Sequence, residues 1–68
     1  MKLSARNVIA GTVTEIESGA VNAVVKVDIG GNVLTSVITM DALAELGIAV
    51  GSPVHAVVKS SSVMLAVD

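Results

Sequence analysis

Hydrophobic and polar residues alternate through the first half of the chain. Over Val21–Ile29 the odd positions are all hydrophobic, whereas the even positions include Asn22, Lys26 and Asp28. A period of two is typical of a strand that has one buried and one solvated face. The pattern therefore predicts a strand over these nine residues.

Two further strands are predicted on either side of this one. Residues 7–17 are rich in β-branched side chains, which favour strands. Gly11 within them indicates a bulge or a sharp bend, as in a strand that curves around a barrel. Gly30-Gly31-Asn32 predicts a tight turn, because Gly and Asn tolerate positive φ. A third strand is then expected over Val33–Thr39.

The hydrophobic period changes after Thr39. Met40, Leu43 and Leu46 recur at three-residue spacing, which predicts a short helix from Met40 to Leu46. Thr39 is the expected N-cap of this helix. Gly47 is the expected residue that closes it, because Gly adopts the left-handed conformation without steric cost.

Two more strands are expected after the turn signal Gly51-Ser52-Pro53, namely Val54–Lys59 and Val63–Val67, with Ser60-Ser61-Ser62 between them. The predicted order is three strands, one helix and two strands. This order favours an all-β fold with one short helix: a five-stranded, partly open barrel of the oligonucleotide/oligosaccharide-binding (OB) type. No repeat or linker divides the chain, so residues 1–68 are expected to form a single domain.

Composition adds a second expectation, because it indicates that several copies of the chain associate. Hydrophobic residues make up 53% of the sequence and charged residues 15%, compared with about 25% charged in typical soluble domains. The chain contains no cysteine, so neither a disulfide nor a thiolate metal site can stabilise so small a domain. His55 is the single histidine and cannot form a metal site by itself. We therefore expect a homo-oligomer whose subunits share a core.

Several classes of function are disfavoured by the same composition. The formal net charge of −2 and the absence of aromatic rings argue against nucleic acid as a partner. The apolar stretches are too short to span a membrane. No signal peptide is visible, because Asn7, Gly11 and Thr12 interrupt the segment after Arg6, so we expect a soluble cytoplasmic protein. One isolated histidine, without paired carboxylates, argues against an enzyme, and no catalytic residue is assigned.

The candidate chemistry lies with two of the four cations, Arg6 and Lys59. Each is embedded in a tetrapeptide of neutral hydrogen-bond donors, Ser4-Ala5-Arg6-Asn7 and Lys59-Ser60-Ser61-Ser62. A cation among such donors suits a compact oxygen-rich anion, which offers acceptors only. Taken singly, the first tetrapeptide could be a polar strand start and the second a solvated hairpin turn. Their occurrence together favours an anion-binding module.

The chain also resembles the molbindins, small cytoplasmic molybdate-binding proteins built from one Mop/TOBE domain. The order and separations of four segments carry this resemblance, which covers essentially the whole chain: Ser4-Ala5-Arg6-Asn7, Thr35-Ser36-Val37-Ile38-Thr39, Glu45-Leu46-Gly47 and Val57-Val58-Lys59-Ser60-Ser61. The resemblance implies a hexamer, arranged as a trimer of dimers, that stores or buffers molybdate or tungstate at its subunit interfaces. It implies no cofactor, and no metal beyond the oxyanion itself.

By position, the resemblance implies anion contacts from Ser4, Arg6, Lys59 and Ser60, with Thr39 supplied by a neighbouring subunit and Ser61 adjacent to the motif. Arg6 either binds the anion directly or orients its loop by pairing with a carboxylate across an interface. The amides at a helix start would add to the contribution of Thr39. The alternative function is a structural, oligomerising module of the same fold whose anion site is vestigial.

Overall fold

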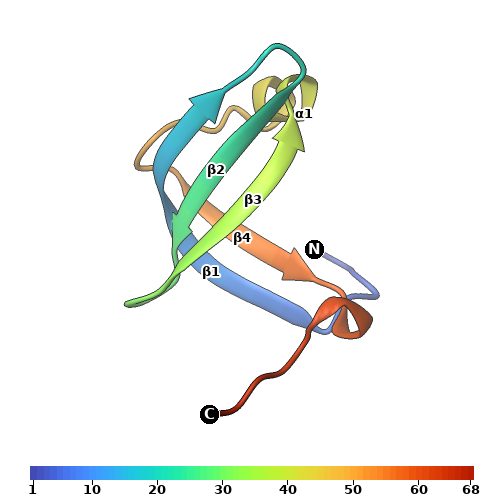
Figure 1. The fold of residues 1–68 in the computed structure, drawn as a ribbon. Coiled ribbons are helices and arrows are strands. Elements are labelled where there is room, and N and C mark those ends of the chain that lie inside the picture. The colour runs from blue at the N-terminus through green and yellow to red at the C-terminus, as the bar shows by residue number, and fades with distance from the viewer.

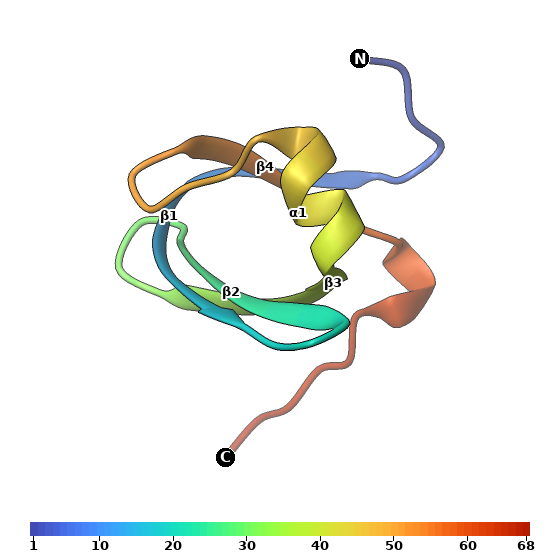
Figure 2. The same ribbon diagram turned by 90° about the horizontal axis from the view of Figure 1, so that it is seen from above.

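Four antiparallel strands curl into an incomplete barrel in the computed structural model, which describes residues 1–68 (Figure 1). The strands are β1 (Asn7–Ser18), β2 (Asn22–Asp28), β3 (Val33–Thr39) and β4 (Pro53–Val58), with helix α1 (Met40–Leu46) before β4 and the 3-10 turn η1 (Ser60–Ser62) after it. The sheet order is β3-β2-β1-β4, so β3 and β4 are its two open edges. Seen from above, the strands form a ring, with α1 beside its open part (Figure 2). The predicted all-β, OB-like fold with one short helix is confirmed.

The core of this barrel is thin. Inward-facing residues alternate along β2, where Ala23, Val25 and Val27 are buried, and Val13 of β1 joins them. These four are the only buried residues of 68. Half-buried aliphatic side chains from β3, α1 and β4 pack around them. The isolated chain therefore encloses little apolar surface, as its composition predicts.

The predicted helix is confirmed at both ends. The Thr39 hydroxyl oxygen accepts a hydrogen bond from the Ala42 amide at 3.0 Å, which makes Thr39 the N-cap of α1. Gly47 ends the helix at φ 64°, in the left-handed region. The turn between β2 and β3 is also where the sequence predicts it, with Gly30 and Gly31 both at positive φ. No helix of the structure is long and apolar enough to cross a lipid bilayer.

The sequence predicts a bulge or a sharp bend at Gly11, and the bulge does not lie there. The β1–β2 register shifts between Val13 and Glu15 instead. Gly11 has a different role, because a Cβ at this position would lie 2.6 Å from Val27 Cγ1 and 2.7 Å from the carbonyl oxygen of Asp28. The absence of a side chain at Gly11 thus lets β1 pass close to the end of β2.

The fifth strand predicted over Val63–Val67 is wrong for the isolated chain, whose sheet has four strands. The η1 turn is held by a hydrogen bond from the Ser62 amide to the Lys59 carbonyl, at 2.9 Å. Beyond it the chain runs away from the barrel and pairs with neither open edge (Figures 1 and 2). An apolar run has the composition of a strand, but a strand forms only where an edge is available to pair with it.

Candidate anion-binding site

The two cation-bearing segments emerge at the same end of the sheet. Asn7 pairs with Val58 at the end of the antiparallel β1–β4 ladder. Arg6 directly precedes β1 and Lys59 directly follows β4, so both segments leave the sheet at this end. Strand pairing therefore brings together two tetrapeptides that lie at opposite ends of the sequence.

The η1 turn adds donors next to Lys59. The carbonyl of Lys59 accepts a hydrogen bond from the Ser62 amide, and the carbonyl of Ser60 accepts one from the Val63 amide at 3.3 Å. The first amides of a helical turn have no partner inside the turn. The amides of Ser60 and Ser61 can therefore donate outward together with the two serine hydroxyls, as a site for an oxyanion requires.

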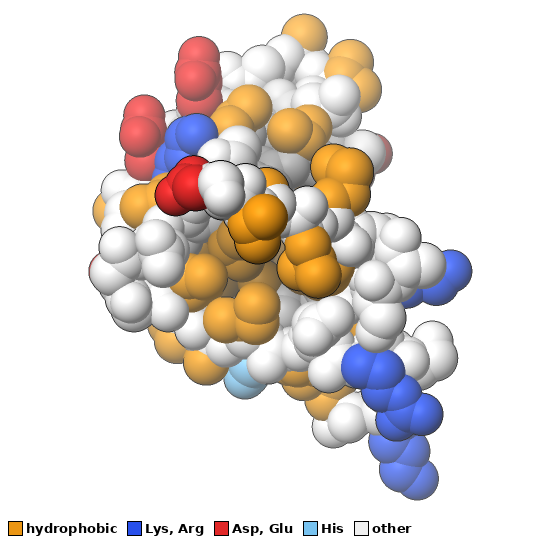
Figure 3. Space-filling model, turned by 60° about the horizontal axis from the view of Figure 1, so that its bottom comes forward, with side chains coloured by type: hydrophobic (Ala, Val, Ile, Leu, Met, Phe, Trp, Pro, Cys, Tyr) orange, Lys and Arg blue, Asp and Glu red, His pale blue; other side chains and the backbone are white.

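We call Ser4, Arg6, Lys59, Ser60 and Ser61 the cationic corner. All five residues are exposed in the isolated chain. Figure 3 shows most of the Lys and Arg side chains towards one end of the molecule, while one further Lys or Arg side chain lies among the Asp and Glu side chains at the other end. Exposed charges are screened by water and salt, and the same charges attract an anion more strongly once a second surface excludes water.

Lys26 has a different setting and does not belong to the cationic corner. It pairs in register with Glu15 on β1, and its ammonium group donates to Thr35 Oγ1 on β3 at 2.8 Å. This cation therefore lies on the sheet, beside a carboxylate-bearing residue and with a protein acceptor. Lys26 supplies a lysine outside the candidate site for comparison with Lys59.

Thr39 lies at the other end of the barrel from Lys59, because α1 and η1 occupy opposite ends of the molecule (Figure 1). The start of α1 is a poor anion site in the isolated chain. The amides of Met40 and Ala42 already donate hydrogen bonds within the protein, and the Asp41 carboxylate in the first turn repels an anion. The hydroxyl hydrogen of Thr39 remains able to donate, since its oxygen serves as the cap acceptor. One chain therefore does not bring Thr39 and Lys59 together.

Ser62 is a candidate donor that the sequence interpretation did not single out. It occupies the same turn as Ser60 and Ser61, and it is exposed. Its place in the serine run directly after Lys59 is the signal that could have identified it. No group of three or more His, Cys, Asp or Glu residues in the structure could hold a metal ion.

The sequence pattern of the TOBE domain matches residues 3–65, nearly the whole chain. This protein belongs to the TOBE-domain family. A probable molybdenum-pterin-binding protein of Haemophilus influenzae is 49% identical over 69 residues, which span 100% of each chain. This match, together with the solved structures below, places the TOBE-domain chain among the molbindins.

Two solved structures share this TOBE fold. A molybdate-binding protein from Sporomusa ovata matches with a TM-score of 0.93 and 38% identity, over 97% of this chain and 98% of that one. The cytoplasmic molybdate-binding protein ModG, crystallised with molybdate bound, matches with a TM-score of 0.83 and 48% identity, over 88% of this chain and 43% of ModG. The TOBE domains of this family bind molybdate as a ligand and are not enzymes.

Proposed function

We propose that this protein is a cytoplasmic, non-catalytic molybdate-binding protein that stores or buffers molybdate, or tungstate, at the subunit interfaces of a homo-hexamer arranged as a trimer of dimers. The observation that carries the proposal is the register of β1 and β4. It brings Arg6 and Lys59 out at one end of the sheet, each within a segment that contains hydroxyl groups and no carboxylate.

The donors at the cationic corner match the chemistry of the anion. Molybdate is a tetrahedral dianion with four acceptor oxygens, so every group around it has to donate. Lys59 supplies a compact positive charge, and Arg6 either adds a second or positions the loop. Charge-assisted hydrogen bonds are roughly twice as strong as neutral ones. The hydroxyls of Ser4, Ser60 and Ser61 then complete the coordination of the anion.

The position of Thr39 supports a site between subunits. Its free hydroxyl hydrogen lies at the opposite end of the barrel from Lys59, and the cationic corner is open to solvent. A second copy that covers this corner with its own Thr39 would add a donor and exclude water. The relatives support the ligand and the compartment, since one is a molybdate-binding protein and another a cytoplasmic protein solved with molybdate bound.

Equilibrium dialysis against molybdate tests the function, with sulfate as the comparison anion. We expect saturable molybdate binding with a fixed number of anions per hexamer. A protein that assembles but retains no molybdate would instead be a structural module with a vestigial site, which is the alternative function. Retention of an oligonucleotide at physiological salt, without retention of molybdate, would likewise contradict the proposal.

A further inference from the structure

Positive and negative side chains are divided between different parts of the chain. Residues 1–14 and 46–67 contain three of the four Lys and Arg residues and no Asp or Glu. Helix α1, which carries two carboxylates, lies at the opposite end of the barrel from η1 (Figure 1). The α1 end of one copy is therefore complementary in charge to the cationic corner of another copy. The carboxylates between the two acid-free segments are Glu15, Glu17, Asp28, Asp41 and Glu45.

Helix α1 turns its carboxylates towards solvent. Asp41 and Glu45 are both exposed, and their spacing of four residues places them on the same face of the helix. Asp41 suits the first turn, where the helix dipole favours negative charge. Glu45 lies at the end that the dipole disfavours, and the last turn contains no basic residue. The outer face of α1 is thus a negative surface that the helix does not neutralise by itself.

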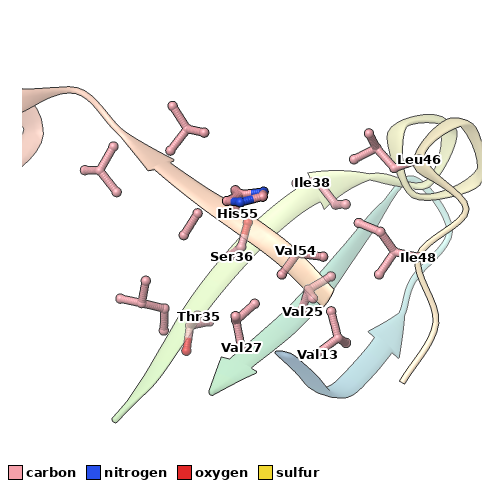
Figure 4. Close-up of a pocket in the computed structure, with 14 residues that line it drawn as sticks. Val13, Val25, Val27, Thr35, Ser36, Ile38, Leu46, Ile48, Val54 and His55 are labelled. Carbon is pink, nitrogen blue, oxygen red and sulfur yellow. The ribbon is translucent and has the colours of Figure 1, made fainter. Parts of the chain in front are cut away.

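The charges of the cationic corner and of α1 have no partner inside the chain. No side-chain hydrogen bond of the structure involves Arg6, Asp41 or Lys59. The pocket inside the barrel offers no partner either, because no Lys, Arg, Asp or Glu residue lines it (Figure 4). Partners for these three side chains therefore have to come from solvent or from another molecule.

The helix start ties the position of Asp41 to that of Thr39. Thr39 is the N-cap of α1, and Asp41 follows two residues later in the first turn. A helix rises only about 1.5 Å per residue. A second copy that covers the cationic corner with its Thr39 therefore brings its Asp41 carboxylate to the same corner. This carboxylate and a bound dianion repel each other more strongly once the interface excludes water, so a cation has to face the carboxylate.

Arg6 is the cation of the corner whose shape suits this carboxylate. A guanidinium group is planar, and its N–H donors match a carboxylate in a bidentate pair. The ammonium group of Lys59 is a compact charge, which suits a tetrahedral oxyanion. Because a guanidinium has five N–H donors, one of its edges can hold a carboxylate while another faces the anion.

We infer that Arg6 of one copy pairs with Asp41 of a second copy at the anion site, where Asp41 acts as a positioning residue. The pair neutralises the carboxylate that arrives with Thr39, and it holds the segment Ser4-Ala5-Arg6-Asn7 against the start of the second copy's helix. This inference rests on the proposed function, because it starts from a cationic corner covered by Thr39. It names the carboxylate that Arg6 contacts across the interface, and the contact forms with or without the anion.

Reversal of the two charges tests this pair. Arg6→Asp places a carboxylate opposite Asp41, and Asp41→Arg places a guanidinium opposite Arg6. The double variant restores opposite charges in the reverse order. Sedimentation velocity over a concentration series, at low salt and without molybdate, gives the concentration at which half of the assembly dissociates. We expect each single substitution to raise this concentration about tenfold or more, because like charges then meet across the interface.

The double variant separates a contact from a general loss of stability, because a purely structural defect in either residue is not repaired by the other substitution. We expect the double variant to associate more tightly than both single variants. A double variant no tighter than the better single variant would overturn the inference. Association as tight as that of the wild type in either single variant would overturn it as well.

Neutral substitutions decide the question if a reversed charge prevents folding. Asp41→Asn keeps the size of the side chain and removes its charge. Glu45→Gln is the matched control, since Glu45 lies on the same exposed face one turn farther from Thr39. We expect Asp41→Asn to weaken association more than Glu45→Gln does. An equal or larger effect of Glu45→Gln would overturn the assignment of the pair to Asp41.

The inference and the proposed function fail in different measurements. Recovery of association in the double variant, together with a wild type that retains no molybdate in equilibrium dialysis, would support the pair and contradict the proposed function. Retention of molybdate by the wild type, without recovery in the double variant, would contradict the pair alone.

Discussion

Asn7 and Val58 are register partners at the end of the β1–β4 ladder. Because the strands are antiparallel, this pairing carries the chain before Asn7 and the chain after Val58 out of the sheet at the same end. Arg6 and Lys59 follow directly on either side. The pairing of Asn7 with Val58 thus brings two cations that are distant in the sequence to the same end of the sheet. The predictions for ligand binding depend on this pairing.

Lys59→Ala should weaken molybdate binding about 10- to 100-fold, because a hydrogen bond to a charged group contributes roughly 1.5–3 kcal/mol. Isothermal titration calorimetry of the folded oligomer measures the change. Lys26→Gln is the matched control, since Lys26 donates to Thr35 on the sheet and lies outside the cationic corner. Equal losses of affinity in the two variants would show that the anion responds to the net charge of the protein and not to the cationic corner.

Arg6 has two possible roles, and a pair of substitutions separates them. If the guanidinium binds the anion, Arg6→Lys should retain part of the affinity, whereas Arg6→Ala should lose about tenfold or more. If Arg6 only orients its loop by pairing with a carboxylate across an interface, Arg6→Ala should weaken assembly along with binding. Calorimetry and sedimentation velocity on the same samples measure the two effects. Wild-type behaviour of Arg6→Ala in both would exclude either role.

Thr39→Asp tests whether the second copy supplies Thr39 to the anion. Asp is a good N-cap, so the stability of α1 should be preserved within about 0.5 kcal/mol. A carboxylate in place of the donor hydroxyl should weaken molybdate binding at least about tenfold through charge repulsion.

Thr39→Ala is the companion variant for stability. It removes the acceptor of the Ala42 amide and should cost about 1 kcal/mol, which lowers Tm by about 4–8 °C at equal protein concentration. Thermal unfolding and calorimetry measure both variants. Full molybdate affinity in Thr39→Asp would place Thr39 outside the site.

Gly11→Ala should destabilise the fold by about 1–3 kcal/mol, because the added methyl group would meet Val27 and the Asp28 backbone at less than 3.0 Å. Thr12→Ala, at an exposed position next to it, should change stability by less than about 0.5 kcal/mol. Chemical denaturation at fixed protein concentration compares the two. A Gly11→Ala protein as stable as the wild type would show that β1 and β2 can separate there without cost.

The sequence predicts local elements of this fold well where local chemistry decides them. The cap at Thr39 and the glycine at Gly47 identify the ends of a helix whose hydrogen bonds lie within a few residues. The alternation around Val25 identifies a strand that has one buried face. The register shift between Val13 and Glu15 has no such signal, because it depends on how β1 pairs with another strand, β2.

The fifth strand shows the limit of the same reasoning. Residues 63–67 have the composition of a strand, but composition does not say whether an edge is available for them to pair with, and in this structure they pair with none. The candidate site has a similar division. Sequence spacing identifies Arg6, Lys59 and Thr39 as candidates. Only the folded structure shows that Arg6 and Lys59 leave the sheet at the same end and that Thr39 lies at the opposite end.

The central claim is that several copies of this chain bind the anion jointly. Native mass spectrometry with and without molybdate tests it most directly, because it reports the number of subunits and the mass of bound anion together. The account predicts a six-subunit assembly that gains mass in whole multiples of one molybdate ion. A monomer whose mass does not change when molybdate is added would contradict it.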